Sequence, residues 1–242
     1  KTAINEKWRN EHYRAISSAP TEDFFYDREI GVAEGSFEYV LRDNETKVAP
    51  IISKLIETRN INTLHALEIN EIATFVSFQM FRTKGSQQST LNLSNQINDG
   101  FERAFGYREE INNRELWFSN LENDDLYRET ILNKTWLLAE SDESFLISDN
   151  PVVLQNTMNQ SEIRGTLGLN SPGIEIYLPI SSSVTLCFFC KQVIPYEVEN
   201  IKCESAHIVN LNWLQIINST RFIFSKYNKF ELIYELIEEG KL

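Results

Sequence analysis

The sequence is poor in cysteine, glycine and proline, and it contains no long hydrophobic run. Its 242 residues include 3 Cys, 9 Gly and 6 Pro, which excludes disulfide-scaffold, collagen-like and low-complexity proteins. The richest apolar run, residues 184–190, has the length of a strand and falls far short of the roughly 18 apolar residues that a membrane span needs. We therefore expect a soluble protein that does not associate with membranes.

The N-terminal segment lacks both an initiator methionine and the apolar core of a signal peptide, so we expect a trimmed chain or a fragment without a secretion signal. Cysteine is present in an odd number, and Cys187 and Cys190 share one apolar run. Disulfides are rare in reducing compartments, and this pattern favours a reduced protein. We expect a cytoplasmic location.

Basic residues are also in the minority. The chain has 23 Lys and Arg against 35 Asp and Glu, and its formal net charge is −12. This balance argues against the broad basic surface with which proteins bind duplex DNA or anionic lipid. The hydrophobic content of 42% is ordinary for a globular protein with one sizeable core. Composition therefore limits the class of protein but does not reveal its chemistry.

Helical periodicity dominates the first half of the chain. A first helix, kinked at Pro50, is predicted by the apolar series Phe37, Leu41, Val48, Ile52 and Leu55. A second helix is predicted over residues 66–84, followed by a polar break at 85–90 and weaker helical patterns near 91–104 and 115–132. The first half is therefore expected to be helical throughout.

Short strand-like runs dominate the second half. Strands are predicted at residues 135–139, 145–148, 152–154, 174–178, 184–190 and 221–224, with a long polar loop at 155–173. Helices are predicted at 205–219 and 230–239. We expect one α+β domain over residues 1–242, in which a helical half (1–133) packs on a mostly antiparallel sheet with two helices (134–242).

Three polar residues interrupt the apolar stripes of the first two helices. Glu45 occupies the step between Leu41 and Val48, so its carboxylate is expected on the core side. Gln79 and Arg82 are neighbours, three residues apart, on the second helix. Buried unpaired polar groups cost about 1–3 kcal/mol, so these side chains need partners.

The strand at 145–148 runs directly into a polar turn, Ser148-Asp149-Asn150-Pro151. A rigid sheet holds side chains at its rim in an accessible position, which suits a functional site. Our hypothesis is that four side chains converge on one polar site: Glu45, Gln79, Arg82 and Asp149. In the alternative, Arg82 only neutralises a carboxylate and ties the two halves together, and the Ser148 hydroxyl caps an ordinary turn.

Several segments carry a family resemblance over roughly residues 24–226. They are Glu45-x-x-x-Ala49, Phe75-x-x-x-Gln79-x-x-Arg82, Trp136 followed by Phe145-Leu-Ile-Ser-Asp-Asn-Pro-Val152, Leu178-Pro179-Ile-Ser, and Asn212 followed by Arg221-Phe-Ile-Phe-Ser225. Together they resemble a widespread bacterial family known only as a domain of unknown function, numbered four-two-three-eight.

The resemblance adds Asn212 to Ser148 and Asn150 as expected binding residues. The family opens with a His-Tyr-Val-Pro-like segment. This sequence has His12-Tyr13 but no Val-Pro after it, so we regard the segment as absent. The resemblance implies a fold and the place of a site, but no reaction.

Cys187, Cys190, Cys203 and His207 have spacings that superficially match a zinc site. Strand geometry would place Cys187 and Cys190 on opposite faces, however, so the two cannot bind one ion without a bulge. We expect no zinc. A divalent cation held jointly by Glu45 and Asp149 remains an open alternative.

Two classes of function follow from these residues. The first is a hydrolase or nuclease-like effector for phosphodiester or acyl bonds, with Glu45 or Asp149 as general base, Arg82 stabilising negative charge and Gln79 orienting water. The bacterial spread of the family suits a toxin or a phage-defence role. The alternative is a non-catalytic module that senses a small ligand or binds a protein. The expected partner is a small anionic ligand or a nucleic acid.

Overall fold

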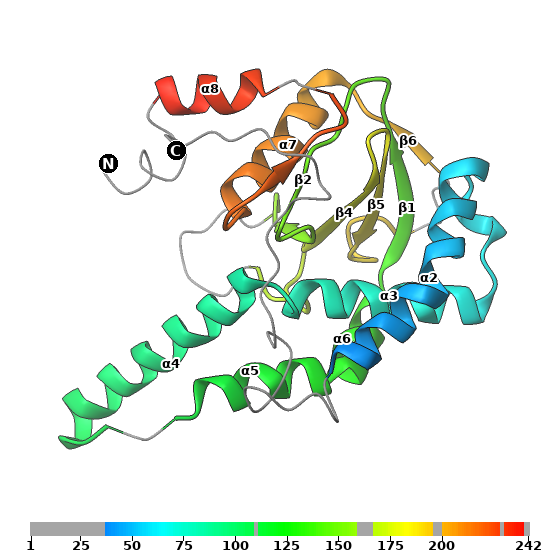
Figure 1. Cartoon of the computed structure of the whole chain (residues 1–242). Helices are drawn as coiled ribbons and strands as arrows, with labels where there is room; N and C mark the ends of the chain where they lie inside the picture. The colour runs from blue at the N-terminus through cyan, green and yellow to red at the C-terminus, as the bar shows by residue number, and fades with distance from the viewer. Residues whose placement is uncertain (1–36, 109–110, 159–166, 196–199, 228–229, 240–242) are drawn as a thin grey trace.

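The computed structural model describes residues 37–108, 111–158, 167–195, 200–227 and 230–239 (Figure 1). His12 and Tyr13, which are compared above with the opening segment of the family, therefore lie outside the described residues. Helices fill the first half, as the periodicity predicts: α2 (Glu38–Thr58), η2 (Ile61–Thr63), α3 (Ala66–Phe81), α4 (Lys84–Phe105), α5 (Asn113–Glu122) and α6 (Asp124–Leu132).

A five-stranded mixed sheet follows, in the spatial order β3-β4-β5-β1-β6. Its strands are β1 (Thr135–Glu140), β3 (Val153–Gln155), β4 (Glu175–Ser181), β5 (Val184–Phe189) and β6 (Asn200–Lys202). The β3–β4, β4–β5 and β5–β1 pairs are antiparallel, whereas β6 runs parallel to β1. The edge strand β6 has no counterpart among the strands expected from the sequence.

A separate two-stranded ladder joins β2 (Ile147–Ser148) to β7 (Ile223–Phe224), with Ser148 opposite Ile223. Helix α7 (Ser205–Asn218) precedes β7, and α8 (Glu231–Glu238) follows it. The expected strand at 145–148 is therefore only two residues long. It leaves the main sheet and pairs with the segment that follows α7.

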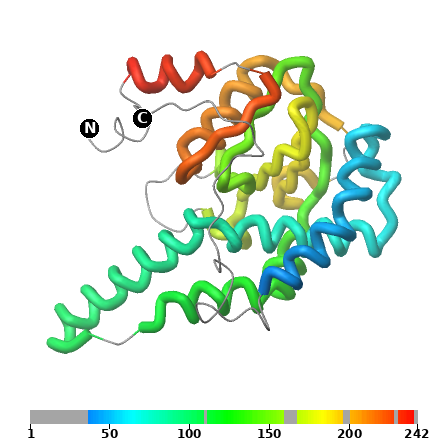
Figure 2. Tube along the Cα trace, in the orientation of Figure 1, coloured from blue at the N-terminus to red at the C-terminus, as the bar shows by residue number. Residues whose placement is uncertain are grey.

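Helices cover both faces of the five-stranded sheet (Figures 1 and 2). On one face, Leu138 and Phe188 belong to the buried cluster that includes residues of α2 and α3. On the other face, Leu137 and Cys187 pack with Leu211 of α7 and its neighbours. Alternate residues of a strand point to opposite faces, so these apolar strands are buried on both sides.

The same alternation separates two of the cysteines. Cys187 belongs to the cluster under α7, while Cys190 belongs to the cluster under α2 and α3. Among the described residues, no group of three or more His, Cys, Asp or Glu side chains is placed to hold a metal ion. In the part of the chain that the structure describes, no helix combines the length and apolar composition of a membrane span.

The buried face of α2 differs from the expected one. Its buried residues are Leu41, Asn44, Val48, Ile51 and Leu55. The polar residue inside the stripe is thus Asn44, whereas the Glu45 side chain is 44% exposed. Positions 44 and 45 are both compatible with helical spacing from 41 to 48, so the sequence pattern alone could not choose between them.

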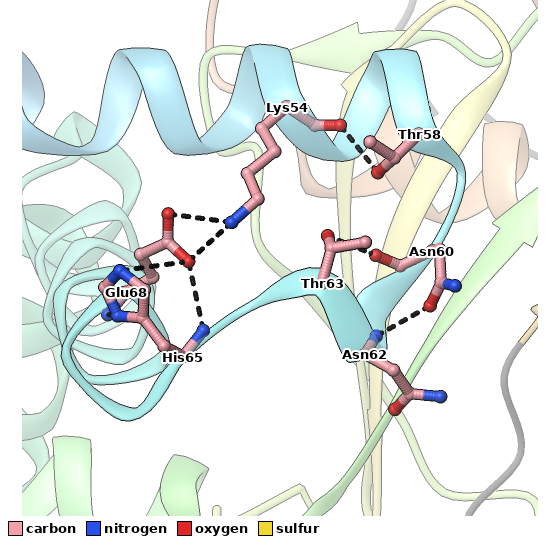
Figure 3. A network of polar contacts seen from close by, with 7 residues as sticks. All are labelled: Lys54, Thr58, Asn60, Asn62, Thr63, His65 and Glu68. Atoms are coloured by element: carbon pink, nitrogen blue, oxygen red, sulfur yellow. Dashed lines mark hydrogen bonds and ion pairs between the residues drawn. The ribbon is translucent and has the colours of Figure 1, made fainter.

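The corner between α2 and α3 is fixed by a polar network (Figure 3). His65 and Glu68 form a capping box: Glu68 N donates to His65 Nδ1 at 3.4 Å, and His65 N donates to Glu68 Oε2 at 3.0 Å. Lys54 of α2 donates to both Glu68 oxygens, at 3.0 and 2.8 Å. The hydrogen bond from Lys54 and that from the His65 N–H lower the pKa of Glu68.

Helix α4 begins earlier than expected and includes the predicted polar break at 85–90. Thr83 caps its first turn, because its Oγ1 accepts a hydrogen bond from Ser86 N at 3.1 Å. The described residues that α4 buries are polar, namely Thr90, Ser94 and Asn98. No apolar stripe therefore marks this part of the helix in the sequence. α4 and α5 lie side by side and project from the body of the molecule (Figures 1 and 2).

Candidate functional site

The Ser148-Asp149-Asn150-Pro151 turn is fastened to α7 by Gln215. This side chain is 1% exposed. Its Oε1 accepts from Ser148 N at 2.9 Å and lies 2.9 Å from Ser148 Oγ, and its Nε2 donates to the Pro151 carbonyl at 2.8 Å. Sequence reasoning missed Gln215. A signal was present, since it follows Asn212 by three residues on a predicted helix and therefore shares its face.

Asn212 fastens the preceding residues in the same way. Its Oδ1 accepts from Leu146 N at 2.7 Å, and its Nδ2 donates to the Ser144 carbonyl at 3.0 Å. Both ends of the amide are thus hydrogen-bonded to the backbone that leads into β2. This geometry suits a positioning role for Asn212, in which it holds the turn.

Asp149 lies at the end of β2 and binds the backbone that follows α7. Its Oδ1 accepts from Thr220 N and its Oδ2 from Arg221 N, both at 2.8 Å. The carboxylate is 14% exposed, and Arg221 Nε lies 3.9 Å from it. In the described part of the chain, no hydrogen bond or ion pair joins Asp149 to Glu45 or Arg82. The carboxylate thus closes the turn after α7.

Glu45 and Arg82 instead pair with each other. The guanidinium of Arg82, which caps the C-terminus of α3, donates to the Glu45 carboxylate on α2. The Glu45 side chain is 44% exposed, and that of Arg82 is 25% exposed. This ion pair ties α2 to the α3–α4 corner. Among the described residues, neither Glu45 nor Asp149 belongs to a group of three or more His, Cys, Asp or Glu side chains that could hold a metal ion.

Two of the residues expected at the site, Gln79 and Asn150, do meet at one pocket of about 600 Å³. It lies between the α3–α4 corner, the turn after β2 and the C-terminal end of α7. Its polar lining includes Gln79, Thr83, Ser86, Asn150, Asn218 and Thr220, and its apolar lining comprises Met80, Val152, Leu154 and Ile217. The volume is in the usual range for small-molecule sites, about 300–1,000 Å³.

Gln79 is the unusual member of this lining. It is 6% exposed, and its amide makes no hydrogen bond with any described residue. The amide is not among the fully buried polar groups without a partner, so its nitrogen or oxygen keeps some accessible surface. An unpaired amide on a pocket wall is therefore available to a bound molecule.

The electrostatics of the pocket come from backbone rather than from side-chain charge. None of its described lining residues carries a formal charge at neutral pH. Thr83, Gly85 and Ser86 belong to the first turn of α4, where helix N–H groups point outward and the helix dipole is positive. The arrangement favours an anionic or hydrogen-bond-accepting group at this end.

Asn150 connects the pocket lining to the end of α7. Its Nδ2 donates to the Asn218 carbonyl at 2.7 Å and to Thr220 Oγ1 at 3.1 Å, at the end of α7. A Cβ added at Gly85 would overlap the same Nδ2. Glycine at position 85 is therefore what allows the amide of Asn150 to lie against the first turn of α4.

We expect Gly85→Ala to displace the Asn150 side chain and to alter the pocket. Loss of its two hydrogen bonds should cost about 2 kcal/mol, partly offset by about 1 kcal/mol from higher helix propensity. Gly100→Ala, on the same helix with no atom within 4 Å of the added Cβ, is the matched control. It should stabilise the protein by about 0.5–1 kcal/mol. Urea unfolding of both variants measures the contrast, and equal changes would contradict the steric argument.

Comparison with known proteins gives a family but no named relative. The family model described as Protein of unknown function (DUF4238) matches residues 4–229. The match extends further towards the N-terminus than the motifs from Glu45 onwards, and it includes the Gln-x-x-Arg helix and the Ser-Asp-Asn-Pro turn. No curated protein and no solved structure matches the chain. Because the model covers most of its length, the chain belongs to the DUF4238 family of proteins of unknown function.

Proposed function

We propose that this protein binds a small ligand in the pocket between the α3–α4 corner and α7, as a sensing or binding module. The observation that carries the proposal is Gln79, whose nearly buried amide lines the pocket without a partner among the described residues. A ligand group that hydrogen-bonds this amide would replace the water that otherwise meets it. The amide both donates and accepts, so it selects a polar group of either kind.

The first turn of α4 defines the chemistry of the ligand further. An anionic group, such as a phosphate or carboxylate, fits a helix N-terminus that no described lining carboxylate opposes. The apolar wall, which includes Met80 and Ile217, suits a less polar body on the same ligand. The proposed ligand is therefore a small organic anion.

Hydrolysis of a phosphodiester or acyl bond is the second candidate, with a toxin or phage-defence effector as its biological form. The observation that favours it is the Glu45–Arg82 pair, which stays partly exposed and whose arginine lies three residues from Gln79. Asp149 contributes less to this candidate, since both of its oxygens accept backbone hydrogen bonds. Turnover of a phosphodiester or ester substrate that is lost in Glu45→Gln would favour this candidate over ligand binding.

The Gln79→Leu variant tests the ligand proposal. Without ligand, replacing the amide by an apolar group of similar size should change the free energy of unfolding by less than about 1 kcal/mol, because the amide loses no protein hydrogen bond. Thermal unfolding with millimolar inorganic phosphate, adenosine monophosphate or citrate should show stabilisation of the wild type that the variant lacks. Asn95→Leu, an exposed amide on α4, is the control and should keep the response. No response from the wild type, or an equal one from Gln79→Leu, would refute the proposal.

A further inference from the structure

A second pocket, of about 460 Å³, lies between α2, α3 and the α5–α6 corner. It shares no described lining residue with the pocket at Gln79. The lining residues that matter for its chemistry are Asn44, Glu71, Asp124, Arg128, Phe37 and Phe78. None of them is among the residues expected at the first site.

Asn44 is the first sign that this pocket has a ligand. The side chain is 5% exposed and lies in the apolar stripe of α2. Its Nδ2 donates at 3.3 Å to both the carbonyl and the Oε2 of Glu71, but its Oδ1 has no hydrogen-bond partner among the described residues. A carbonyl oxygen left unpaired at this depth lowers stability unless a donor reaches it.

Arg128, on α6, presents the opposite kind of group to the same pocket. Its Nη2 pairs with Asp125 Oδ1 at 2.6 Å, while its buried Nε has no partner in the described part of the chain. Two residues of the lining therefore carry an unsatisfied buried atom, an acceptor on Asn44 and a donor on Arg128. Both atoms are shielded from solvent, and both belong to residues that line the pocket.

The charges around these two atoms are mainly negative. Asp43 and Lys47 pair with each other at 2.7 Å, and the lining then carries Glu71, Glu122 and Asp124 against Arg128. Burial, and then the negative charge of Asp125, raise the pKa of Asp124. A bound cation would favour the charged form of Asp124.

The apolar part of the lining gives the ligand a second requirement. Phe37 and Phe78 meet edge to face, with ring centroids 5.6 Å apart, and both line the pocket. An aliphatic side chain fits against these rings, and an ammonium group beside them gains cation–π attraction.

We propose that this pocket binds a free amino acid with an apolar side chain. The ammonium group donates to Asn44 Oδ1 and pairs with the Glu71 carboxylate, and the ligand carboxylate accepts from Arg128 Nε. The aliphatic side chain lies against Phe37 and Phe78. The ligand thus satisfies both unpaired atoms at once, which neither a simple amine nor a simple carboxylate does.

Isothermal titration of the whole chain with three compounds that share the isobutyl group of leucine tests this proposal. L-Leucine carries both charged groups, isoamylamine only the ammonium, and isovalerate only the carboxylate. We expect leucine to bind, isoamylamine to bind at least tenfold more weakly, and isovalerate to show no binding, because removing a charge-assisted hydrogen bond lowers affinity by about tenfold or more. Absence of leucine binding at millimolar concentration, or tighter binding of isovalerate, would overturn the proposal.

Variants of the lining then assign the individual interactions. Asn44→Leu should abolish leucine binding, and Arg128→Lys, which keeps the charge but has no Nε, should lower leucine affinity to that of isoamylamine. Asn95→Leu and Gln79→Leu should both bind leucine as the wild type does, which separates this site from the first pocket. Leucine affinity unchanged in Arg128→Lys refutes the assignment even if Asn44→Leu does not fold.

Discussion

Replacement of Gln215 by alanine is expected to lower the free energy of unfolding by about 3–4 kcal/mol. The residue is 1% exposed and bonds the backbone on both sides of the Ser148–Pro151 turn. Alanine would leave the Ser148 N–H and the Pro151 carbonyl without partners and would open a cavity beneath α7. Each of these effects is costly in a buried position, and here they occur together.

Chemical denaturation at neutral pH measures this change directly. Asn210→Ala is the matched control: an amide on the same helix, partly exposed, with one hydrogen bond to Gln155 Oε1 at 2.8 Å. Loss of this hydrogen bond in Asn210→Ala should lower the free energy of unfolding by about 1 kcal/mol or less. A Gln215→Ala variant no less stable than this control would show that the turn is held by other interactions.

Asp149→Ala should lower the free energy of unfolding by about 2–3 kcal/mol, because two charge-assisted hydrogen bonds to backbone N–H groups are removed. Both bonds are 2.8 Å long and join β2 to the residues after α7. Asp149→Asn retains one acceptor oxygen and should lose about half as much. In thermal and urea unfolding we expect the wild type to be the most stable, Asp149→Asn to be intermediate and Asp149→Ala to be the least stable.

The control for Asp149 is Asp142→Ala. Its side chain is 87% exposed and pairs with Lys202 at 2.8 Å, and such exposed pairs contribute little to stability. If Asp149→Ala instead left stability unchanged and removed only a catalytic turnover, the carboxylate would be a catalytic group, and the hydrolase hypothesis would gain its general base. The free energy of unfolding of Asp149→Ala therefore distinguishes a structural role of this carboxylate from a catalytic one.

The sequence alone determined the elements whose signals are local. The helix at 66–84 and the strands at 135–139 and 184–190 were predictable because their apolar residues repeat at the period of the element. It also determined the family, since the Gln-x-x-Arg helix and the Ser-Asp-Asn-Pro turn are contiguous patterns. Where α4 buries Thr90, Ser94 and Asn98, the apolar repeat is missing, and the prediction placed the helix start too late.

Only the tertiary structure decided which polar residues meet. Gln79 and Asn150 line one pocket although 71 positions separate them, because β2 leaves the main sheet and pairs with β7 beside the end of α7. The sequence indicated that Glu45, Arg82 and Asp149 needed partners, but not that Arg82 would pair with Glu45 while Asp149 bound the backbone after α7. The periodicity of the sequence pattern places a residue on one face of its own helix or strand. Which other element covers that face depends on contacts between distant segments, and no local pattern records them.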